Sequence, residues 1–526
     1  MPRMAHEVGD AVHGIELPRP HRSVRWLQSV AALLAAIAVL RSAGFVFGIL
    51  NIDESDFTLI AKRMLQGAVP FTEIVDIKPP LAYVPFLSGA LFGGLSITPV
   101  HVLGIFWVLA TCFVLGRAAR RLTGNEVAAA CAPWLALLAS LCEVPSVSTE
   151  LLMALPAAGA LYFYVRAETG GGIRDQLLAG LCIGGASLIR QQAGILVAAF
   201  CLALCWHAFR QRDVRRLLGP IAVTSGFALP WIATLGIFAH LGALSEFWDW
   251  VVTRNLRYAP GGTSYDTLLR AAQALPLCVG SAVVPWVLAT RETFRPIVRG
   301  PARTGVVLAL WLSWIVVSMG GRFYEHYFLQ FVPPLALLAS PQAAALVQSW
   351  PAFSRLRRAL FATACALPAL VLLVFSFARG IAGGYPEQEP RARALAGWLA
   401  RNTAPDERVF IWGHYSPIYY LAGRLPGTRY VTTSVHVGNF DPGHLRGDVD
   451  LAPFRSDQDV ALTLRDLETN TVPVFVDTSP AGIHHWDRVP LSTVPALERY
   501  LREHYALVAE IEGSRVYRRR VAAGAP

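Results

Sequence analysis

The sequence predicts a polytopic α-helical membrane protein that ends in an α/β domain. Hydrophobic residues make up 54% of the chain and charged residues only 16%, with a mean hydropathy of +0.44. This composition is too apolar for an ordinary soluble protein. The apolar runs fill residues 26–380, whereas residues 381–526 have a mixed composition. We therefore expect a transmembrane module over 26–380 and a separate domain over 381–526.

The apolar runs divide into about eleven segments, judged against the ~18–24 residues that a hydrocarbon core of about 30 Å requires. They cover residues 26–48, 98–117, 126–142, 149–165, 176–189, 192–208, 219–240, 267–289, 304–319, 327–347 and 359–378.

Arginine clusters between these segments fix the expected orientation. They lie in the N-terminal arm and near residues 117–121, 166–174, 210–216, 291–303 and 355–358. Eleven spans with the N-terminus inside place every cluster on the cytoplasmic side, as the positive-inside bias requires. Residues 1–25 then form a cytoplasmic arm, and residues 381–526 lie outside. The net charge of +10 reflects this topology and anionic inner-leaflet lipids, and we expect no nucleic-acid partner.

The first external loop, residues 49–97, concentrates acid and base directly after an apolar segment. Asp53 and Glu54 precede an amphipathic stretch, and Asp76 and Lys78 follow in the run Asp-Ile-Lys-Pro-Pro. The chain has only two lysines, Lys62 and Lys78, and both lie here. Charged groups avoid hydrocarbon unless they carry function, so this loop indicates a reaction site at the membrane surface.

The expected topology collects further charges on the same external side. Glu150 ends the second external loop, Arg190 separates two apolar segments, and Arg322 and His326 precede the tenth segment. Cations can stabilise a leaving phosphate, and a carboxylate can deprotonate an acceptor hydroxyl. The combination favours group transfer from a phosphate-bearing lipid.

Residues 381–526 show helical patterns near 391–402, 459–468 and 493–504, with strand-like runs at Val409–Trp412 and 472–476. This alternation predicts a small α/β domain. It contains no nucleotide-binding motif. The eight cysteines of the chain all fall in or beside the apolar segments, so we expect no disulfide framework. Aromatic and arginine residues between 242 and 266 predict an external amphipathic segment in the interface.

The order of these first-loop residues resembles the GT-C superfamily of integral-membrane glycosyltransferases. The similarity is greatest to the bacterial branch related to protein O-mannosyltransferases and the lipid A aminoarabinose transferase. It rests on the Asp53-Glu54 pair, a helix ending at residues 63–67, and the run at 76–80. The later run of residues 326–334, His-Tyr-Phe-Leu-Gln-Phe-Val-Pro-Pro, is also similar to that branch.

The resemblance implies roles at matching positions. Asp53 corresponds to the proposed catalytic base, with Glu54 beside it as a helper or metal ligand. Lys78 corresponds to a lysine that contacts the donor phosphate, Glu150 to the second-loop acid, and Tyr327 to a tyrosine near the lipid phosphate. With these we group Arg190 and Arg322 as phosphate-binding residues and Asp76 and His326 as further residues of the cleft.

One position of this motif departs from the family pattern. The aminoarabinose enzymes carry glutamate immediately before the motif lysine, whereas this chain has Ile77 there and Asp76 one position earlier. A divalent metal ion could bind among the candidates Asp53, Glu54, Asp76 and His326.

Each residue also has a simpler interpretation. Asp53 and Glu54 could cap the following helix, and Glu150 could be a helix N-terminal acid without chemistry. Lys78 could extend its ammonium group to the interface, and Arg190 could bind phospholipid headgroups. Arg322 and His326 could form a structural pair with Glu325 or another loop.

Together these observations predict a bacterial inner-membrane enzyme. It would transfer a sugar, with inversion, from a polyprenyl-phosphate donor to an acceptor hydroxyl at the periplasmic or extracellular face. The expected acceptor is lipopolysaccharide or another envelope glycan, a glycolipid, or a protein, and membrane lipids surround the bundle. A transporter or flippase of lipid-linked sugars is the alternative, although its coupling charges should lie near the bilayer midplane. A non-catalytic scaffold is a third possibility.

Overall fold

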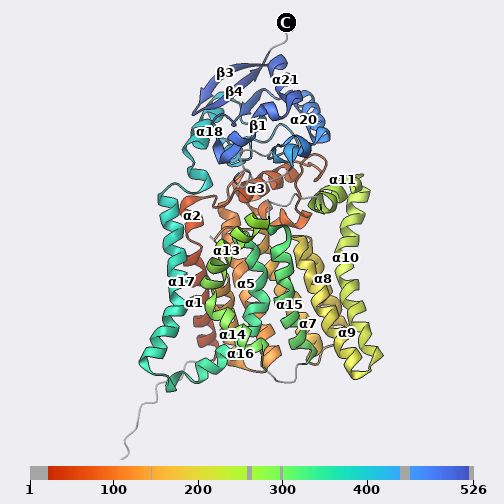
Figure 1. Ribbon diagram of the computed structural model, residues 1–526, viewed down its shortest axis with the longest axis vertical. Coiled ribbons are helices and arrows are strands. Elements are labelled where there is room, and N and C mark those ends of the chain that lie inside the picture. The colour runs from red at the N-terminus through yellow and green to blue at the C-terminus, as the bar shows by residue number, and fades with distance from the viewer. Residues whose placement is uncertain are drawn as a thin grey trace, which may run out of the picture.

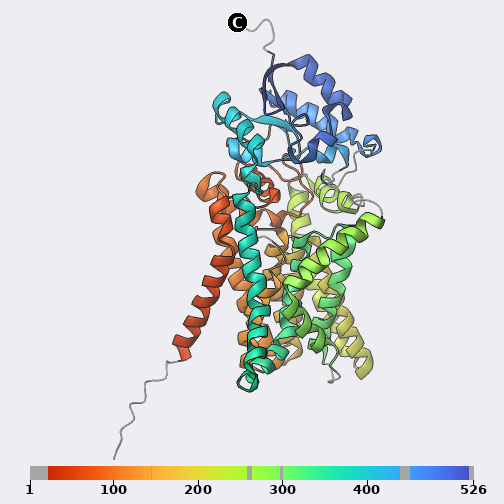
Figure 2. The same ribbon diagram turned by 60° about the vertical axis from the view of Figure 1, so that its left-hand side comes forward.

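The computed structural model describes residues 22–143, 145–256, 264–295, 300–438, 443 and 450–520. Its helices form an upright bundle, and the described strands lie in a small domain at one end of that bundle (Figure 1). Helix α17 (Arg355–Ile381) runs along the bundle and leads into this domain (Figure 2). The predicted class, a helical membrane protein with a C-terminal α/β domain, is confirmed. Residues 1–21 of the expected cytoplasmic arm lie outside the described residues.

The bundle helices follow the predicted segments. They are α1 (Arg22–Leu40) with α2 (Ala43–Phe47), α5 (Thr98–Thr123), α6 (Glu126–Ala139), α7 (Thr149–Glu168), α8 (Ile173–Ser187), α9 (Ile195–Gln211), α10 (Leu218–His240), α13 (Ser264–Ser281) with α14 (Val283–Thr293), α15 (Pro301–Ser318), α16 (Val332–Gln348) and α17. Outside them lie α3 (Ile52–Leu65), α4 (Leu87–Gly93), α11 (Leu244–Trp248) and α12 (Arg254–Leu256).

The number of full membrane spans differs from the expectation of about eleven. Within the described residues, seven helices are long and apolar enough to cross a membrane, or eight if α13 and α14, bent by 87°, form one broken span. Helices α6 and α8 have only 14 and 15 residues, and α7 carries charged residues near both ends. Each predicted segment is helical, but composition and length support fewer complete spans.

The C-terminal domain contains one four-stranded sheet with the order β1-β2-β4-β3. Strands β1 (Val409–Trp412) and β2 (Val474–Asp477) are parallel, and β3 (Tyr505–Ile511) and β4 (Ser514–Arg519) complete the sheet in antiparallel pairings. Helices α18 (Pro390–Asn402), α19 (Pro417–Ala422), α20 (Asp457–Thr469) and α21 (Pro495–His504) accompany it. The two predicted strands and three predicted helices are present, whereas the hairpin of β3 and β4 was not predicted.

The C-terminal domain is joined to the first loop by main-chain and side-chain contacts. Val75 donates its amide hydrogen to the Arg429 carbonyl oxygen at 3.0 Å and forms a parallel bridge with Tyr430. The hydroxyls of Ser55 and Ser416 lie 2.6 Å apart. These contacts link α3 and the loop after it to the C-terminal domain. The domain therefore constrains the loop that carries the predicted site.

A second link runs through the segment after α10. Arg254 forms an ion pair with Asp459 at 2.8 Å, and its guanidinium lies 3.9 Å from the ring centroid of Trp250. Asp459 also accepts a hydrogen bond from the Tyr430 hydroxyl at 2.8 Å. Trp248 is 50% exposed but Trp250 only 5%, so the aromatic residues of this segment divide between its surface and its contact with the domain.

Helices α8 and α10 approach closely because glycines face the neighbouring backbone. A Cβ atom added at Gly180 would collide with the Val223 carbonyl oxygen, and one at Gly226 would collide with the Leu177 carbonyl oxygen. Small residues permit such contact between membrane helices, where packing replaces the hydrophobic effect as the main attraction. This pair supports the start of the segment that carries Arg190.

We predict that Gly180→Ala lowers the thermal unfolding midpoint of the full chain in detergent. Overpacking of this kind costs about 1–3 kcal/mol. Gly185→Ala is the matched control, because a Cβ atom there meets no atom within 4 Å and the gain in helix propensity is the same. Equal midpoints for the two variants would contradict the close packing of α8 on α10.

Candidate active site

The first helix of the site, α3, begins with a complete capping box. The Asn51 side chain accepts a hydrogen bond from the Asp53 amide at 3.1 Å, and the Glu54 side chain returns to the amide of Asn51. Such reciprocal bonds satisfy the free amide groups of a helix N-terminus. The local sequence therefore fixes where α3 starts and which way Asp53 and Glu54 project.

Glu54 is fully buried and occupied by hydrogen bonds. Its carboxylate accepts from the amides of Leu50 at 2.8 Å and Val147 at 2.7 Å, and it lies 3.0 Å from His101 Nε2. Burial alone would raise the pKa of Glu54, but attraction to His101 and these hydrogen bonds outweigh it and hold the pKa below its usual value. These contacts occupy the Glu54 carboxylate and join the start of α3 to α5 and to the chain just before α7.

Asp53 differs from its neighbour because it is only partly buried and its carboxylate makes no hydrogen bond to a described residue. Asp56 stands one turn further along the same side of α3. Its Oδ1 atom is buried without a partner, and burial, followed by the charge of Asp53, raises the pKa of Asp56 well above its usual range. Asp56 was not among the predicted site residues, although its spacing of three from Asp53 signals a shared face.

The loop that carries Lys78 is held in place by hydrogen bonds that other side chains donate to two of its main-chain carbonyl oxygens. The Tyr83 hydroxyl lies 2.9 Å from the Lys78 carbonyl oxygen and 3.1 Å from Asp76 Oδ2, and Asn255 Nδ2 donates to the Ile77 carbonyl oxygen at 2.8 Å. Burial raises the pKa of Asp76, against the attraction of Lys78. The Lys78 ammonium group makes no hydrogen bond or ion pair with a described residue, so it is available to a ligand.

Arg190 and Glu150 form a buried ion pair at 2.9 Å. Glu150 lies in the first turn of α7, which Ser148 caps, and the Thr149 hydroxyl donates to its Oε2 at 2.9 Å. The Arg190 guanidinium is 4.9 Å from the ring centroid of Tyr327. Burial opposes the charge on Arg190, but Glu150, Tyr327 and Asp53 together outweigh it, and the pKa of Arg190 rises further. The pair and the aromatic face fix the orientation of the cation.

His326 lies between two carboxylates. Its Nδ1 is 3.9 Å from Glu143 Oε1 and its Nε2 is 3.9 Å from Glu150 Oε1, while its ring stacks on Tyr324 with centroids 5.4 Å apart. Burial, followed by repulsion from Glu150, raises the pKa of Glu143 well above its usual range. Glu143 is a second member of the cluster that sequence reasoning missed, because the loop between α6 and α7 contains no motif.

The predicted residues from distant parts of the chain meet around this histidine. Asp53, Lys78, Glu150 and Arg190 all interact electrostatically with His326. Arg322 is 4% exposed and begins the turn that leads to His326. The structure therefore brings together charges from the first loop, the start of α7, the α8–α9 connection and the turn before α16.

Within the described residues, no group of three or more histidine, cysteine, aspartate or glutamate side chains has a metal-binding arrangement. Glu54, one of the four candidate ligands, already uses its carboxylate for hydrogen bonds. The residues do not fit a resident metal ion, and we derive no chemical step through one.

The sequence of the chain was compared with known protein families and with curated proteins. Residues 77–237 match the sequence profile of the family described as dolichyl-phosphate-mannose-protein mannosyltransferase. No curated protein sequence matched the chain.

Solved structures share the architecture over nearly the whole chain. The crystal structure of ArnT from Cupriavidus metallidurans bound to undecaprenyl phosphate aligns with a TM-score of 0.62 and 15% identity, over 96% of this chain and 100% of ArnT. The oligosaccharyltransferase AglB from Archaeoglobus fulgidus, in complex with an inhibitory peptide and a dolichol-phosphate, aligns with a TM-score of 0.58 and 14% identity, over 96% and 75% of the respective chains. The chain has the GT-C fold, so the predicted resemblance is confirmed at the level of architecture.

We predict that Glu54→Gln lowers the stability of the full chain by about 2–3 kcal/mol, because a buried charge-assisted hydrogen-bonding group is lost. The lowered pKa of Glu54 means that its contribution is present above about pH 4.5, its usual value, and disappears as the pH falls through the lowered value. Thermal unfolding from pH 7 to 3 should therefore show a smaller acid-induced loss in the variant.

Asp53→Asn is the control for this measurement, because the adjacent carboxylate makes no hydrogen bond to a described residue. Similar midpoints for Glu54→Gln and the wild-type chain at pH 7 would argue against the anchoring role of Glu54.

Proposed function

We propose that this protein transfers a sugar from a polyprenyl-phosphate donor to a hydroxyl group of an acceptor. The observation that carries the proposal is that Asp53 and Lys78, whose side chains make no hydrogen bond to a described residue, both act electrostatically on His326. That histidine lies 3.9 Å from Glu150, the ion-pair partner of Arg190. The profile match at residues 77–237 and the lipid phosphate in the similar ArnT structure support a lipid-linked donor.

Asp53 acts as the general base. Its carboxylate takes the proton from the acceptor hydroxyl while that oxygen attacks the anomeric carbon of the donor. The bond from that carbon to the phosphate oxygen breaks, and the lipid phosphate leaves with the electron pair. Attack from the face opposite the leaving group inverts the anomeric centre. No covalent intermediate with the protein is needed.

Lys78 and Arg190 stabilise the phosphate as negative charge develops on it. Glu150 and Tyr327 are positioning residues in this scheme, since one pairs with Arg190 and the other offers it an aromatic face. Arg322 adds positive charge from the turn before His326. Asp56 and Asp76 hold protons more readily than exposed aspartates, which limits the negative charge near the departing phosphate.

The reaction takes place at the external face of a bacterial inner membrane. The arginine clusters mark the opposite ends of the helices as cytoplasmic, so the loop of residues 49–97 and the C-terminal domain lie outside. The polyprenyl tail stays in the bilayer while its phosphate reaches the charged cluster, and nucleotide sugars are not expected on this side. The acceptor is an envelope glycan such as lipopolysaccharide, a glycolipid or a protein hydroxyl.

We predict that Asp53→Asn reduces the transfer rate by about 10²–10⁴-fold, the usual contribution of a general base. The assay supplies the purified chain with a polyprenyl-phosphate sugar pool and an envelope extract as acceptor. Asp457→Asn is the matched control, because its side chain is 83% exposed on α20. Full turnover by Asp53→Asn would remove Asp53 as the base.

Lys78→Gln should weaken productive donor binding by about tenfold or more, since a charge-assisted contact to phosphate contributes about 1.5–3 kcal/mol. Initial rates measured against donor concentration would show a higher KM, a lower kcat, or both. Lys62→Gln is the control, because it removes the only other lysine in the chain and lies on the same helix-and-loop segment. Equal kinetics for both variants would exclude Lys78 from donor binding.

A further inference from the structure

A polar cavity lies where the first loop meets the C-terminal domain. It encloses about 440 Å³ and is bordered on one side by the end of α3 and the turn after it, and on the other by segments around β1 and α20. The cationic residues that line it are Arg63, Arg408 and Arg429, and the acidic residues are Glu73 and Asp466. Arg63 follows Asp53 by ten positions on α3, a rise of about 15 Å.

The positive charge in this cavity is not balanced by its carboxylates. Asp466 is saturated by Arg429, since it accepts from the Arg429 Nε at 2.9 Å, Nη2 at 2.8 Å and main-chain amide at 3.0 Å. Glu73 instead accepts from the Val69 amide at 2.8 Å and forms no ion pair with a described residue. Neither Arg63 nor Arg408 has a carboxylate oxygen within ion-pairing distance among the described residues.

Arg63 is the residue of this cavity that points most clearly to an anionic ligand. Its side chain is only 9% exposed, and its Nε atom is buried without a hydrogen-bond partner. Its one hydrogen bond to a described residue runs from Nη1 to Gln66 Oε1 at 3.5 Å. Burial, followed by repulsion from Arg408, lowers the pKa of Arg63. Two guanidinium groups that repel each other in a partly enclosed space are stabilised when an oxyanion lies between them.

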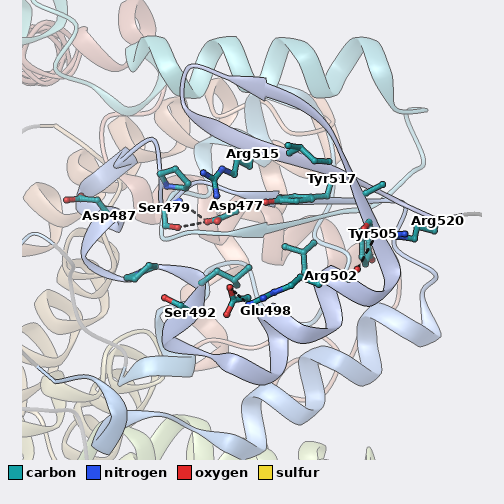
Figure 3. A pocket seen from close by; sticks show the side chains of 16 residues that line it. Asp477, Ser479, Asp487, Ser492, Glu498, Arg502, Tyr505, Arg515, Tyr517 and Arg520 are labelled. Atoms are coloured by element: carbon teal, nitrogen blue, oxygen red, sulfur yellow. Dashed lines mark hydrogen bonds and ion pairs between the residues drawn. The ribbon is translucent and has the colours of Figure 1, made fainter.

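The larger hollow in the C-terminal domain has no such imbalance. It encloses about 890 Å³ beside β2, β3, β4 and α21, and its side chains are drawn in Figure 3. There Asp477 accepts from the Ser479 hydroxyl at 2.6 Å, and Glu498 pairs with Arg502 at 2.6 Å. Its lining carries three acidic and three basic side chains, so its formal charges balance and it has no excess of positive charge.

We propose that the cavity between Arg63 and Arg408 is an acceptor subsite that binds an oxyanion, a phosphate or carboxylate group carried by the acceptor molecule. The inference rests on the proposed sugar transfer for its role as an acceptor site. The cavity is separate from the cluster of Lys78 and Arg190, which takes the donor phosphate. Because the cavity lies between α3 and the C-terminal domain, one acceptor molecule can contact both the domain and the loop of residues 49–97.

The test measures binding of radiolabelled inorganic phosphate to the full chain in nanodiscs of neutral lipid. Lys78→Gln serves as the background, because it weakens the donor phosphate site. In this background Arg408→Gln should weaken phosphate binding at least tenfold, whereas Arg408→Lys should retain part of it. Arg401→Gln is the matched control, because Arg401 is exposed on α18 and does not line the cavity.

Equal phosphate affinity for the Arg408→Gln and Arg401→Gln variants would overturn the proposal. Response to anionic lipid in the nanodiscs, without response to soluble phosphate, would also overturn it by identifying a headgroup site. Competition by glucuronate but not by glucose would extend the site to carboxylates, and displacement by glucose would contradict an oxyanion site. Because binding is read without sugar transfer, this result stands or fails independently of the catalytic proposal.

A kinetic assay of sugar transfer to the acceptor complements the binding measurement. The Arg408→Gln variant should raise the KM for an anionic envelope acceptor, whereas the Arg401→Gln variant should leave that KM unchanged. An unchanged acceptor KM would contradict the assignment of the cavity to the acceptor.

Discussion

The arrangement of the site depends on the buried carboxylate of Glu54. Through its bonds to Leu50 and Val147 and its contact with His101, this group ties the start of α3 to α5 and to the chain just before α7. Asp53 precedes Glu54, and Glu150 follows Val147 by three residues. One buried acid thus sets the separation between the unbonded carboxylate and the residues that orient Arg190. Its cost of burial is offset because every strong contact it makes is a hydrogen bond or an opposite charge.

A second constraint comes from the C-terminal domain. The bridge between Val75 and Tyr430, the Ser55–Ser416 contact and the Arg254–Asp459 ion pair fasten it to the first loop and to the segment after α10. The same segment holds the Ile77 carbonyl oxygen through Asn255. The domain therefore helps shape the loop that presents Lys78, in addition to forming one wall of the arginine-lined cavity.

Sequence patterns predicted the class of the protein and most of the residues in the cluster, because charges beside membrane-length apolar runs are rare and stand out. They also gave β1, β2 and three helices of the C-terminal domain. The hairpin of β3 and β4 escaped notice because most of its residues are at least partly exposed and its apolar alternation is weak. Glu143 and Asp56 were missed since neither belongs to a motif, and only the fold places Glu143 beside His326. The two roles of the Asp53-Glu54 pair were indistinguishable in sequence, because a helix cap and a catalytic acid use the same residue types.

The central claim is sugar transfer from a lipid-phosphate donor on the side of the membrane that carries the C-terminal domain. Sealed vesicles containing the full chain test it most directly. The donor, a polyprenyl-phosphate sugar labelled in its sugar, is placed in the bilayer, and envelope acceptor is supplied only to the face that exposes the C-terminal domain. The account predicts labelled acceptor joined through an anomeric bond of inverted configuration, together with release of the lipid phosphate. Movement of the labelled lipid across the bilayer with no new glycosidic bond would contradict it and identify a lipid-sugar transporter instead.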